Sequence, residues 1–154
     1  MKKTIIGKDI YYTLAWSPLY KYDRFDAMRK LPELSGIISI MYMNQSRIDY
    51  LMFYSCHRDG CRVGFKKLMD PYSTRFPELI KELDLSRLHY KYTVTDSASL
   101  NDMQDIMYWL IRTYKPKYNE GGFKDSQRFA NIFINEIERN KDDVIEKIIG
   151  HRGA

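Results

Sequence analysis

The sequence lacks the features that mark disulfide-rich, membrane-spanning and secreted proteins. Its 154 residues include only two cysteines, Cys56 and Cys61, too few for a disulfide framework. No apolar run approaches the ~18 residues that a membrane-spanning helix needs. The basic start of the chain also lacks the long apolar stretch of a signal peptide. Because these features are missing, we expect a cytoplasmic protein with no membrane partner.

The composition is that of an ordinary globular protein. Apolar residues make up 44% and charged residues 29%, and the length suits one domain. The formal net charge is +5, and the excess lies in the first two thirds of the chain, which permits a weakly basic face for phosphate. Thirteen tyrosines supply amphipathic rings that can pack, stack or form hydrogen bonds.

The clearest predicted element is a helix over residues 100–114. Its apolar residues recur at the spacing of one helical face, and Pro116 follows its end. The residues of this stripe are Met103, Ile106, Met107, Leu110, Ile111 and Tyr114. We predict a second long helix over residues 126–149, with an apolar face built from Phe129, Ile132, Phe133, Ile137, Val144, Ile145 and Ile148.

The remaining pattern predicts an α+β fold. Apolar and β-branched runs predict a hairpin of two strands, and a third strand follows later in the chain. Short helices are expected between them, and Asp23 is expected to cap an earlier one. The expected ranges are 37–43, 48–54 and 88–95 for the strands, and 23–31, 62–69 and 77–85 for the helices. The sequence therefore predicts a small, mainly antiparallel three-stranded sheet covered by helices.

We expect three parts in one globule. Residues 1–30 are predicted to be an N-terminal extension packed on the core. Residues 31–122 would form the central α+β domain, and residues 123–154 a C-terminal helix.

The hairpin and a later segment carry a family resemblance. Gly36 to Ile38 stands in the first predicted strand, and Leu51 to Ser55 ends the second. The segment Lys115-Pro116-Lys117-Tyr118-Asn119 follows the long helix. Together with the element order, these residues resemble the GIY-YIG nuclease fold. Members of that family use two tyrosines, an arginine and a metal-binding glutamate to cut nucleic acid.

The resemblance implies a site with altered catalytic positions. Ile38 stands where the first tyrosine is expected, and Ser55 replaces a glycine. Met107 occupies the position of the metal-binding glutamate, and a thioether is a poor ligand for a hard divalent cation. We therefore interpret Met107 as a core residue and expect no metal site and no cofactor. Asn119, with Gly36, would support the motif.

A catalytic role is implied only if the domain is active. Arg62 and Tyr54 would then act on the phosphate and the attacking water, with Mg²⁺ or Mn²⁺ bound by a relocated carboxylate. The carboxylates available for this are Asp59, Asp102 and Asp105.

A cluster of basic residues after the hairpin suggests a surface for phosphate. Its members are Arg58, Arg62, Lys66 and Lys67, and a spacing of four places Arg62 and Lys66 on one helical face. By contrast, Cys56, His57 and Cys61 are too few for a zinc site. The leading hypothesis is a catalytically impaired GIY-YIG-like domain that binds DNA, RNA or a protein partner without cleavage. The alternatives are an active metal-dependent endonuclease and a protein-interaction or homo-oligomer module that uses the C-terminal helix.

Overall fold

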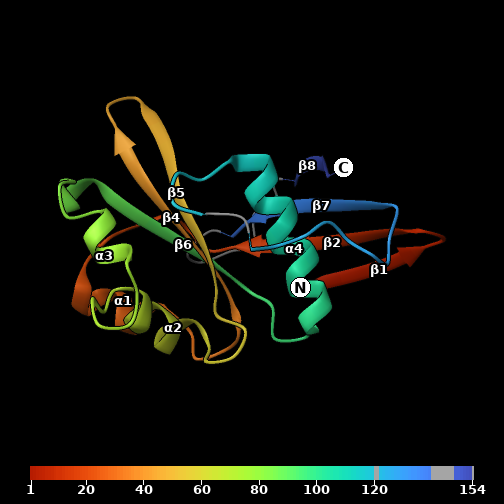
Figure 1. The fold of residues 1–154 in the computed structure, drawn as a ribbon, viewed down its shortest axis with the longest axis horizontal. Coiled ribbons are helices and arrows are strands. Elements are labelled where there is room, and N and C mark those ends of the chain that lie inside the picture. Colours follow the sequence, from red (N-terminus) through yellow and green to blue (C-terminus); the bar gives the residue numbers. More distant parts are fainter. Residues whose placement is uncertain (120–121, 140–147, 154) are drawn as a thin grey trace.

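The structure, a computed structural model, describes residues 1–119, 122–139 and 148–153 (Figure 1). Its strands are β1 (Lys2–Ile6), β2 (Asp9–Trp16), β3 (Tyr20–Lys21), β4 (Gly36–Asn44), β5 (Arg47–Ser55), β6 (Leu88–Val94), β7 (Asn131–Glu138) and β8 (Ile148–Gly153). Its helices are α1 (Arg24–Lys30), α2 (Cys61–Leu68), α3 (Phe76–Leu79) and α4 (Leu100–Tyr114), with a 3₁₀ turn over Leu85–Arg87. Within the described residues, no helix is long and apolar enough to cross a bilayer.

The expected three-stranded sheet is wrong. The three predicted strands exist as β4, β5 and β6, but they belong to one eight-stranded sheet of order β5-β4-β6-β2-β7-β8, in which β1 also pairs with β2 and β3 with β6. The fold remains α+β, and its strand pairs are antiparallel except β2 with β7, which run parallel over eight residue pairs. β6 meets β2 at a single register pair, Trp16 with Thr93.

The predicted C-terminal helix is also wrong. Residues 131–138 form strand β7 and residues 148–153 form strand β8, while residues 140–147 of the prediction lie outside the described residues. Ile132, Ile134 and Glu136 of β7 are buried and alternate with less buried neighbours, which is the period of a strand. The apolar positions of this segment fit both periods, and pairing with β2 selects the strand.

The N-terminal residues supply an interior strand of the sheet, β2. Residues 1–30, expected to be an extension packed on the core, supply β1, β2, β3 and α1. Alternate residues of β2 are completely or almost completely buried: Ile10, Tyr12, Leu14 and Trp16. β2 is therefore an amphipathic strand with one face in the core.

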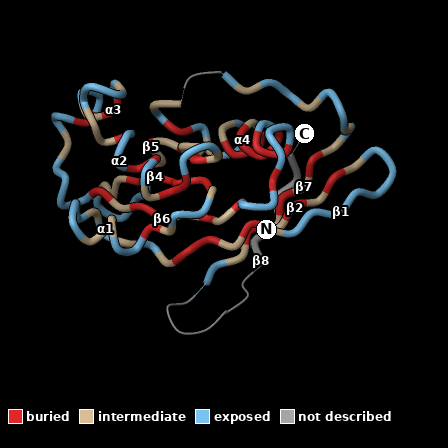
Figure 2. The backbone as a smooth tube through the Cα atoms, turned by 90° about the horizontal axis from the view of Figure 1, so that it is seen from below, coloured by how far each residue is buried: buried red, intermediate tan, exposed pale blue. Residues whose placement is uncertain are grey.

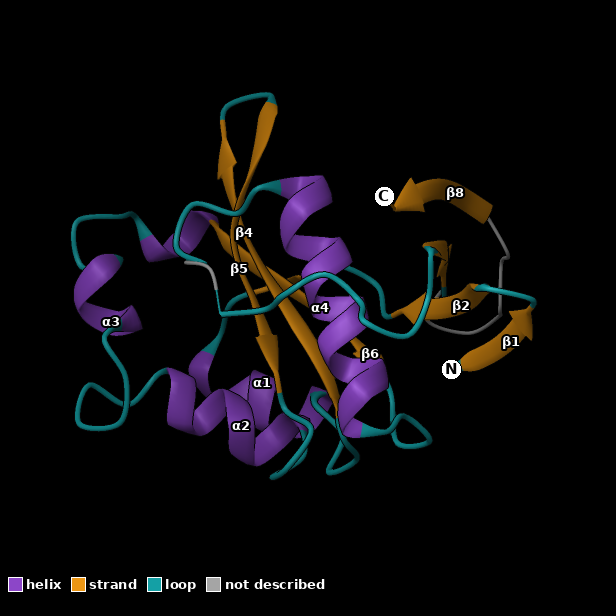
Figure 3. Ribbon diagram, turned by 45° about the vertical axis from the view of Figure 1, so that its right-hand side comes forward, coloured by secondary structure: helices purple, strands orange, loops and turns teal. Residues whose placement is uncertain are grey.

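Helices cover both faces of the sheet (Figures 2 and 3). Helix α4 packs on one face over a first core, which includes Trp16, Ile37, Phe53 and Ile134. Helices α1 and α2 pack on the other face over a second core, which includes Ile38, Leu51, Phe65 and Tyr90. The sheet therefore separates two hydrophobic cores.

Helix α4 confirms its prediction residue for residue. Ser99 accepts a hydrogen bond from the backbone N–H of Asp102, and the Asp102 carboxylate accepts one from the backbone N–H of Ser99, which forms a capping box. Asp23 caps α1 as predicted. The predicted helix over residues 77–85 is shorter in the structure, where α3 ends at Leu79.

A buried carboxylate fastens the start of α4 to the sheet. Asp102 is fully buried and accepts hydrogen bonds from the Tyr12 hydroxyl at 2.8 Å and the Lys3 ammonium at 2.9 Å. The Arg128 guanidinium lies 3.4 Å from Asp102 and 2.8 Å from Asp105. This network joins β1, β2, α4 and the segment before β7.

We predict that Asp102→Ala lowers the free energy of unfolding by about 1–3 kcal/mol, because it leaves the buried Tyr12 hydroxyl without its acceptor and removes the partner of the partly exposed Lys3 ammonium. Urea denaturation would measure the loss. The control is Asp26→Ala, since Asp26 pairs with Arg29 and Lys30 on the exposed side of α1. Equal losses in the two variants would contradict the assigned role of Asp102.

The same carboxylate should make stability depend on pH. Burial alone would raise the pKa of Asp102, but hydrogen bonds from Ser99, Lys3 and Tyr12 outweigh it and hold this pKa below its usual range. The stabilisation is therefore fully present above the unfolded-state pKa of about 3.9 and is lost as the pH falls toward the folded-state pKa. We predict that the stability gap between wild type and Asp102→Asn shrinks below about pH 4. A gap independent of pH between 2 and 6 would refute this.

Candidate functional site

Four of the residues at positions of the resembled motif line one hollow beside β5, here called the strand-edge hollow. They are Tyr54, Ser55, Met107 and Asn119, and the cavity volume is about 480 Å³. The other lining residues are Met52, Phe53, Leu68, Thr74, Arg75, Phe76, Leu79, Tyr118 and Phe123, so no acidic side chain from the described residues lines it. Met107 is 1% exposed and packs in the first core, which confirms its interpretation as a core residue.

The chemistry of the strand-edge hollow is that of a mainly apolar surface. Burial raises the pKa of Tyr54, so its phenol stays protonated at neutral pH. In the described part of the chain, no three side chains of His, Cys, Asp or Glu gather closely enough to hold a metal ion. The carboxylates considered as relocated ligands have cationic partners: Asp59 pairs with Lys67, and Asp102 and Asp105 pair with Arg128.

The predicted basic cluster does not form one free cationic surface. The Arg62 guanidinium donates to the Leu31 carbonyl at 3.1 Å and lies 3.0 Å from the Glu33 carboxylate. Lys67 is 3.0 Å from Asp59. Arg58 lies in the exposed loop before α2, and Lys66 lines a separate groove between α1 and α2.

Gly36 and Ile38 contribute to packing of the fold. A Cβ atom at Gly36 would lie 2.3 Å from the carbonyl oxygen of Thr93 and 2.6 Å from Sγ of Cys61, so only glycine fits this approach of β4 to β6. Ile38 is fully buried in the second core. Cys56 and Cys61 are both buried free thiols.

A β-bulge redirects the side chains of the hairpin. The register between β4 and β5 shifts between Ile40, which faces Met52, and Met41, which faces Tyr50. Leu51 is therefore the extra residue. As a result, Tyr50 and Phe53, three residues apart, both pack against the first core, and their ring centroids are 6.0 Å apart. In a regular strand they would face opposite sides.

The segment after α4 is bound along the outer edge of β5. The backbone N–H groups of Lys117 and Tyr118 donate to the carbonyls of Tyr50 and Leu51 at 3.0 and 2.9 Å. The Asn119 side chain accepts from the Phe53 N–H at 2.7 Å and donates to the Phe53 carbonyl at 3.0 Å. These four bonds cover an edge that would otherwise expose unpaired backbone groups.

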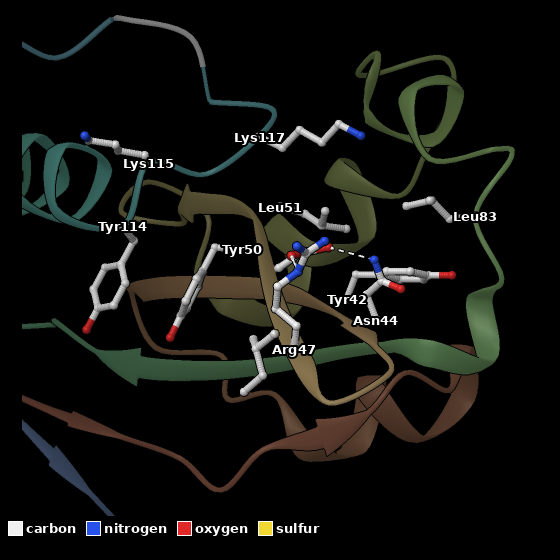
Figure 4. A pocket seen from close by; sticks show the side chains of 11 residues that line it. Tyr42, Asn44, Arg47, Tyr50, Leu51, Leu83, Tyr114, Lys115 and Lys117 are labelled. Atoms are coloured by element: carbon white, nitrogen blue, oxygen red, sulfur yellow. Dashed lines mark hydrogen bonds and ion pairs between the residues drawn. The ribbon is translucent and has the colours of Figure 1, made fainter.

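A second hollow lies on the other side of this segment, at the free end of the hairpin (Figure 4). We call it the hairpin hollow. Its volume is about 530 Å³, and it is lined by Tyr42, Asn44, Arg47, Ile48, Asp49, Tyr50, Leu51, Leu83, Tyr114, Lys115 and Lys117. Tyr50 and Tyr114 lie next to each other, with ring centroids 4.7 Å apart, and Lys117 extends above Arg47 and Leu51.

The hairpin hollow carries an excess of positive charge. Three cations face one anion, Asp49, which lies 2.9 Å from Arg47. Lys115 and Lys117 are exposed and have no acidic partner among the described residues. Lys115 adopts a left-handed conformation, with φ of 50°, at the end of α4. The hollow therefore presents two ammonium groups that have no carboxylate partner in the described residues, and Nζ of Lys117 lies 5.4 Å from the ring centroid of Tyr118.

Tyr50 and Tyr114 of the hairpin hollow keep their hydroxyl protons at neutral pH. Burial raises the pKa of Tyr50, and the nearby carboxylates Glu136 and Glu138 raise it further. Burial also raises the pKa of Tyr114, whose hydroxyl donates to the buried carboxylate of Glu136. Chemically, the hollow can bind an anion while apolar or aromatic groups pack against its rings.

The sequence did not point to this hollow. Its cations and tyrosines come from both hairpin strands and from the end of α4, more than sixty residues further along the chain, so no linear motif unites them. The one available signal was the alternation of Lys115, Lys117 and Tyr118 directly after a helix end. The resemblance to a nuclease motif assigns this segment a different role.

The comparisons replace that resemblance with a different family. A family model described as "Uncharacterised protein" matches residues 1–148, so the chain belongs to this family. No curated protein and no solved structure matches the chain. The identification as a GIY-YIG-like nuclease domain is therefore wrong: the match covers nearly the whole chain, and it is not to the GIY-YIG family.

We predict that Asn119→Ala loosens the segment on β5 and costs about 1–3 kcal/mol of unfolding free energy, because two hydrogen bonds to Phe53 are lost. Hydrogen exchange should become faster at the amides of Phe53 and Tyr118. A matched control is Asn44→Ala, since Asn44 makes only a long 3.4 Å contact with Asp49. Unchanged exchange at Phe53 would show that Asn119 does not hold this edge.

Proposed function

We propose that this domain binds single-stranded nucleic acid in the hairpin hollow and does not cleave it. The observation that carries the proposal is the meeting of two lysines, neither with a carboxylate partner in the described part of the chain, with three tyrosines, Tyr42, Tyr50 and Tyr114, in one concave surface. Proteins that bind single strands combine cations for the backbone with aromatic rings for the bases. The net charge of +5 supports the same class of partner.

The geometry supports binding at this place more than at the predicted basic cluster. There, Arg62 and Lys67 are held by Glu33 and Asp59, and a ligand would have to replace these partners. At the hairpin hollow, Lys115 and Lys117 need no such exchange. The proposal also places the protein in the cytoplasm, an assignment that the two free thiols support.

We predict that Lys115→Ala combined with Lys117→Ala weakens binding of a fluorescent 20-nucleotide single strand and lowers the slope of log K against log salt by about 1.4, two contacts at ~0.7 each. Fluorescence anisotropy with DNA and RNA strands, and with a duplex of the same sequence, would measure this. The matched control removes two lysines from the β1–β2 hairpin, Lys2→Ala with Lys8→Ala, and should leave the slope unchanged.

Two results would overturn the proposal. One is no binding by the wild type at 50 mM salt, and the other is an equal loss in the control variant. The same incubations with Mg²⁺ or Mn²⁺ test the alternative of an active endonuclease. Intact strands are expected, and cleavage would replace the binding-only function.

A further inference from the structure

A third concave surface lies between α1 and α2. These two helices lie away from the free end of the β4–β5 hairpin (Figure 3). This α1–α2 groove has a volume of about 610 Å³. Its apolar lining includes Phe25, Met28, Phe65 and Met69. Aromatic and thioether side chains form most of the surface, with two cations and one carboxylate among them. Methionine side chains adapt to partners of varied shape and recur on protein-binding surfaces.

Phe25 is the most unusual residue of the α1–α2 groove. It lies in the first turn of α1 and is 78% exposed, although Ala27 and Leu31 of the same region are completely buried. Asp23 caps the helix through the backbone N–H groups of Phe25 and Asp26, so the position of Phe25 is set by the cap. A ring fixed at the margin of an apolar groove can enter a partner as an anchor.

The charges around the α1–α2 groove are distributed unevenly. Asp26 is paired with Arg29 and Lys30, whereas Asp70, the one carboxylate in the lining, accepts hydrogen bonds from the backbone N–H of Tyr72 and the hydroxyl of Ser73 and keeps its negative charge. Arg24 and Lys66, on opposite helices, have no acidic partner among the described residues. The Arg24 guanidinium instead lies 5.9 Å from the Phe25 ring centroid. The lining thus carries two cations against one carboxylate, an excess of one positive charge beside an apolar floor.

We propose that the α1–α2 groove docks an acidic amphipathic helix of a partner protein. The apolar stripe of that helix would pack on Met28, Phe65 and Met69 and receive Phe25 between its turns. Carboxylates beside the stripe would meet Arg24 and Lys66. Helices bind grooves in this way through apolar anchors at positions i, i+3, i+4 and i+7. The charge of the groove selects an acidic helix, because a basic one would bring like charges together.

The test uses the full chain and a fluorescein-labelled 18-residue probe helix with leucines at the anchor positions and glutamates elsewhere. A second probe carries lysines in place of the glutamates. We expect the acidic probe to bind and the basic probe to bind at least tenfold more weakly. Phe25→Ala should weaken acidic-probe binding about tenfold, the effect of losing one anchor. Phe25 is exposed, so the variant should keep the thermal stability of the wild type.

Charge reversal and a neutral control make the test specific. Arg24→Glu with Lys66→Glu should abolish the preference for the acidic probe. Val63→Ala should have no effect, because Val63 is exposed on α2 but does not line the groove. Amide chemical-shift changes on adding the acidic probe should map to α1 and α2.

Three outcomes would overturn the proposal. The first is no binding of the acidic probe up to 1 mM, and the second is equal binding of both probes. The third is concentration-dependent self-association that Phe25→Ala removes, which would make a second copy of this chain the occupant. The two proposals fail separately. If a single strand binds the Lys115 and Lys117 variant as tightly as the wild type, the proposed function is contradicted and the groove proposal is unaffected.

Discussion

The parallel pairing of β2 with β7 is the constraint on which the rest of the structure depends. It joins a strand from the start of the chain to one near its end, over eight residue pairs from Asp9 with Asn131 to Trp16 with Glu138. Without it, the sheet would lose β7 and β8, and α4 would cover only part of a core. The same pairing brings Arg128 to the carboxylates at the start of α4. The pairing of β2 with β7 thus fixes the start of α4 and, through Glu136, also its end.

The other end of α4 is fixed by Glu136 of β7. This carboxylate is 3% exposed and accepts hydrogen bonds from the Trp16 indole at 2.8 Å and from the Tyr114 hydroxyl. A buried charge is tolerated only where such donors surround it. Because Tyr114 ends α4, Glu136 also sets where the Lys115–Asn119 segment begins and hence where it meets β5. The hairpin hollow is a consequence of this sequence of contacts.

Periodicity and capping residues in the sequence correctly predicted the elements that depend on contacts between near neighbours in the chain. The stripe of α4, the Asp23 cap of α1 and the strands of the hairpin all follow from period and capping chemistry, and the structure has them. The strand β7 was mistaken for a helix because Ile132, Phe133 and Ile137 satisfy a helical spacing, and only its partner β2 distinguishes the two. The bulge at Leu51 has no glycine or other signal in the sequence, yet it turns Tyr50 toward Tyr114. The residues of the hairpin hollow could not be foreseen without it.

The cations without a carboxylate partner among the described residues locate the positive surface better than the net charge does. Arg62 and Lys67 stood together in the sequence and suggested a phosphate surface, but each has an acidic neighbour in space. Exposed ion pairs contribute little to stability, so their main effect here is to reduce the positive potential of that face. Lys115 and Lys117 lie at one end of the molecule, and Arg24 and Lys66 at another, in surfaces of different chemistry. Tyrosines accompany the first pair, and methionines and phenylalanines the second. The two linings share no residue, so a substitution in one surface leaves the side chains of the other in place.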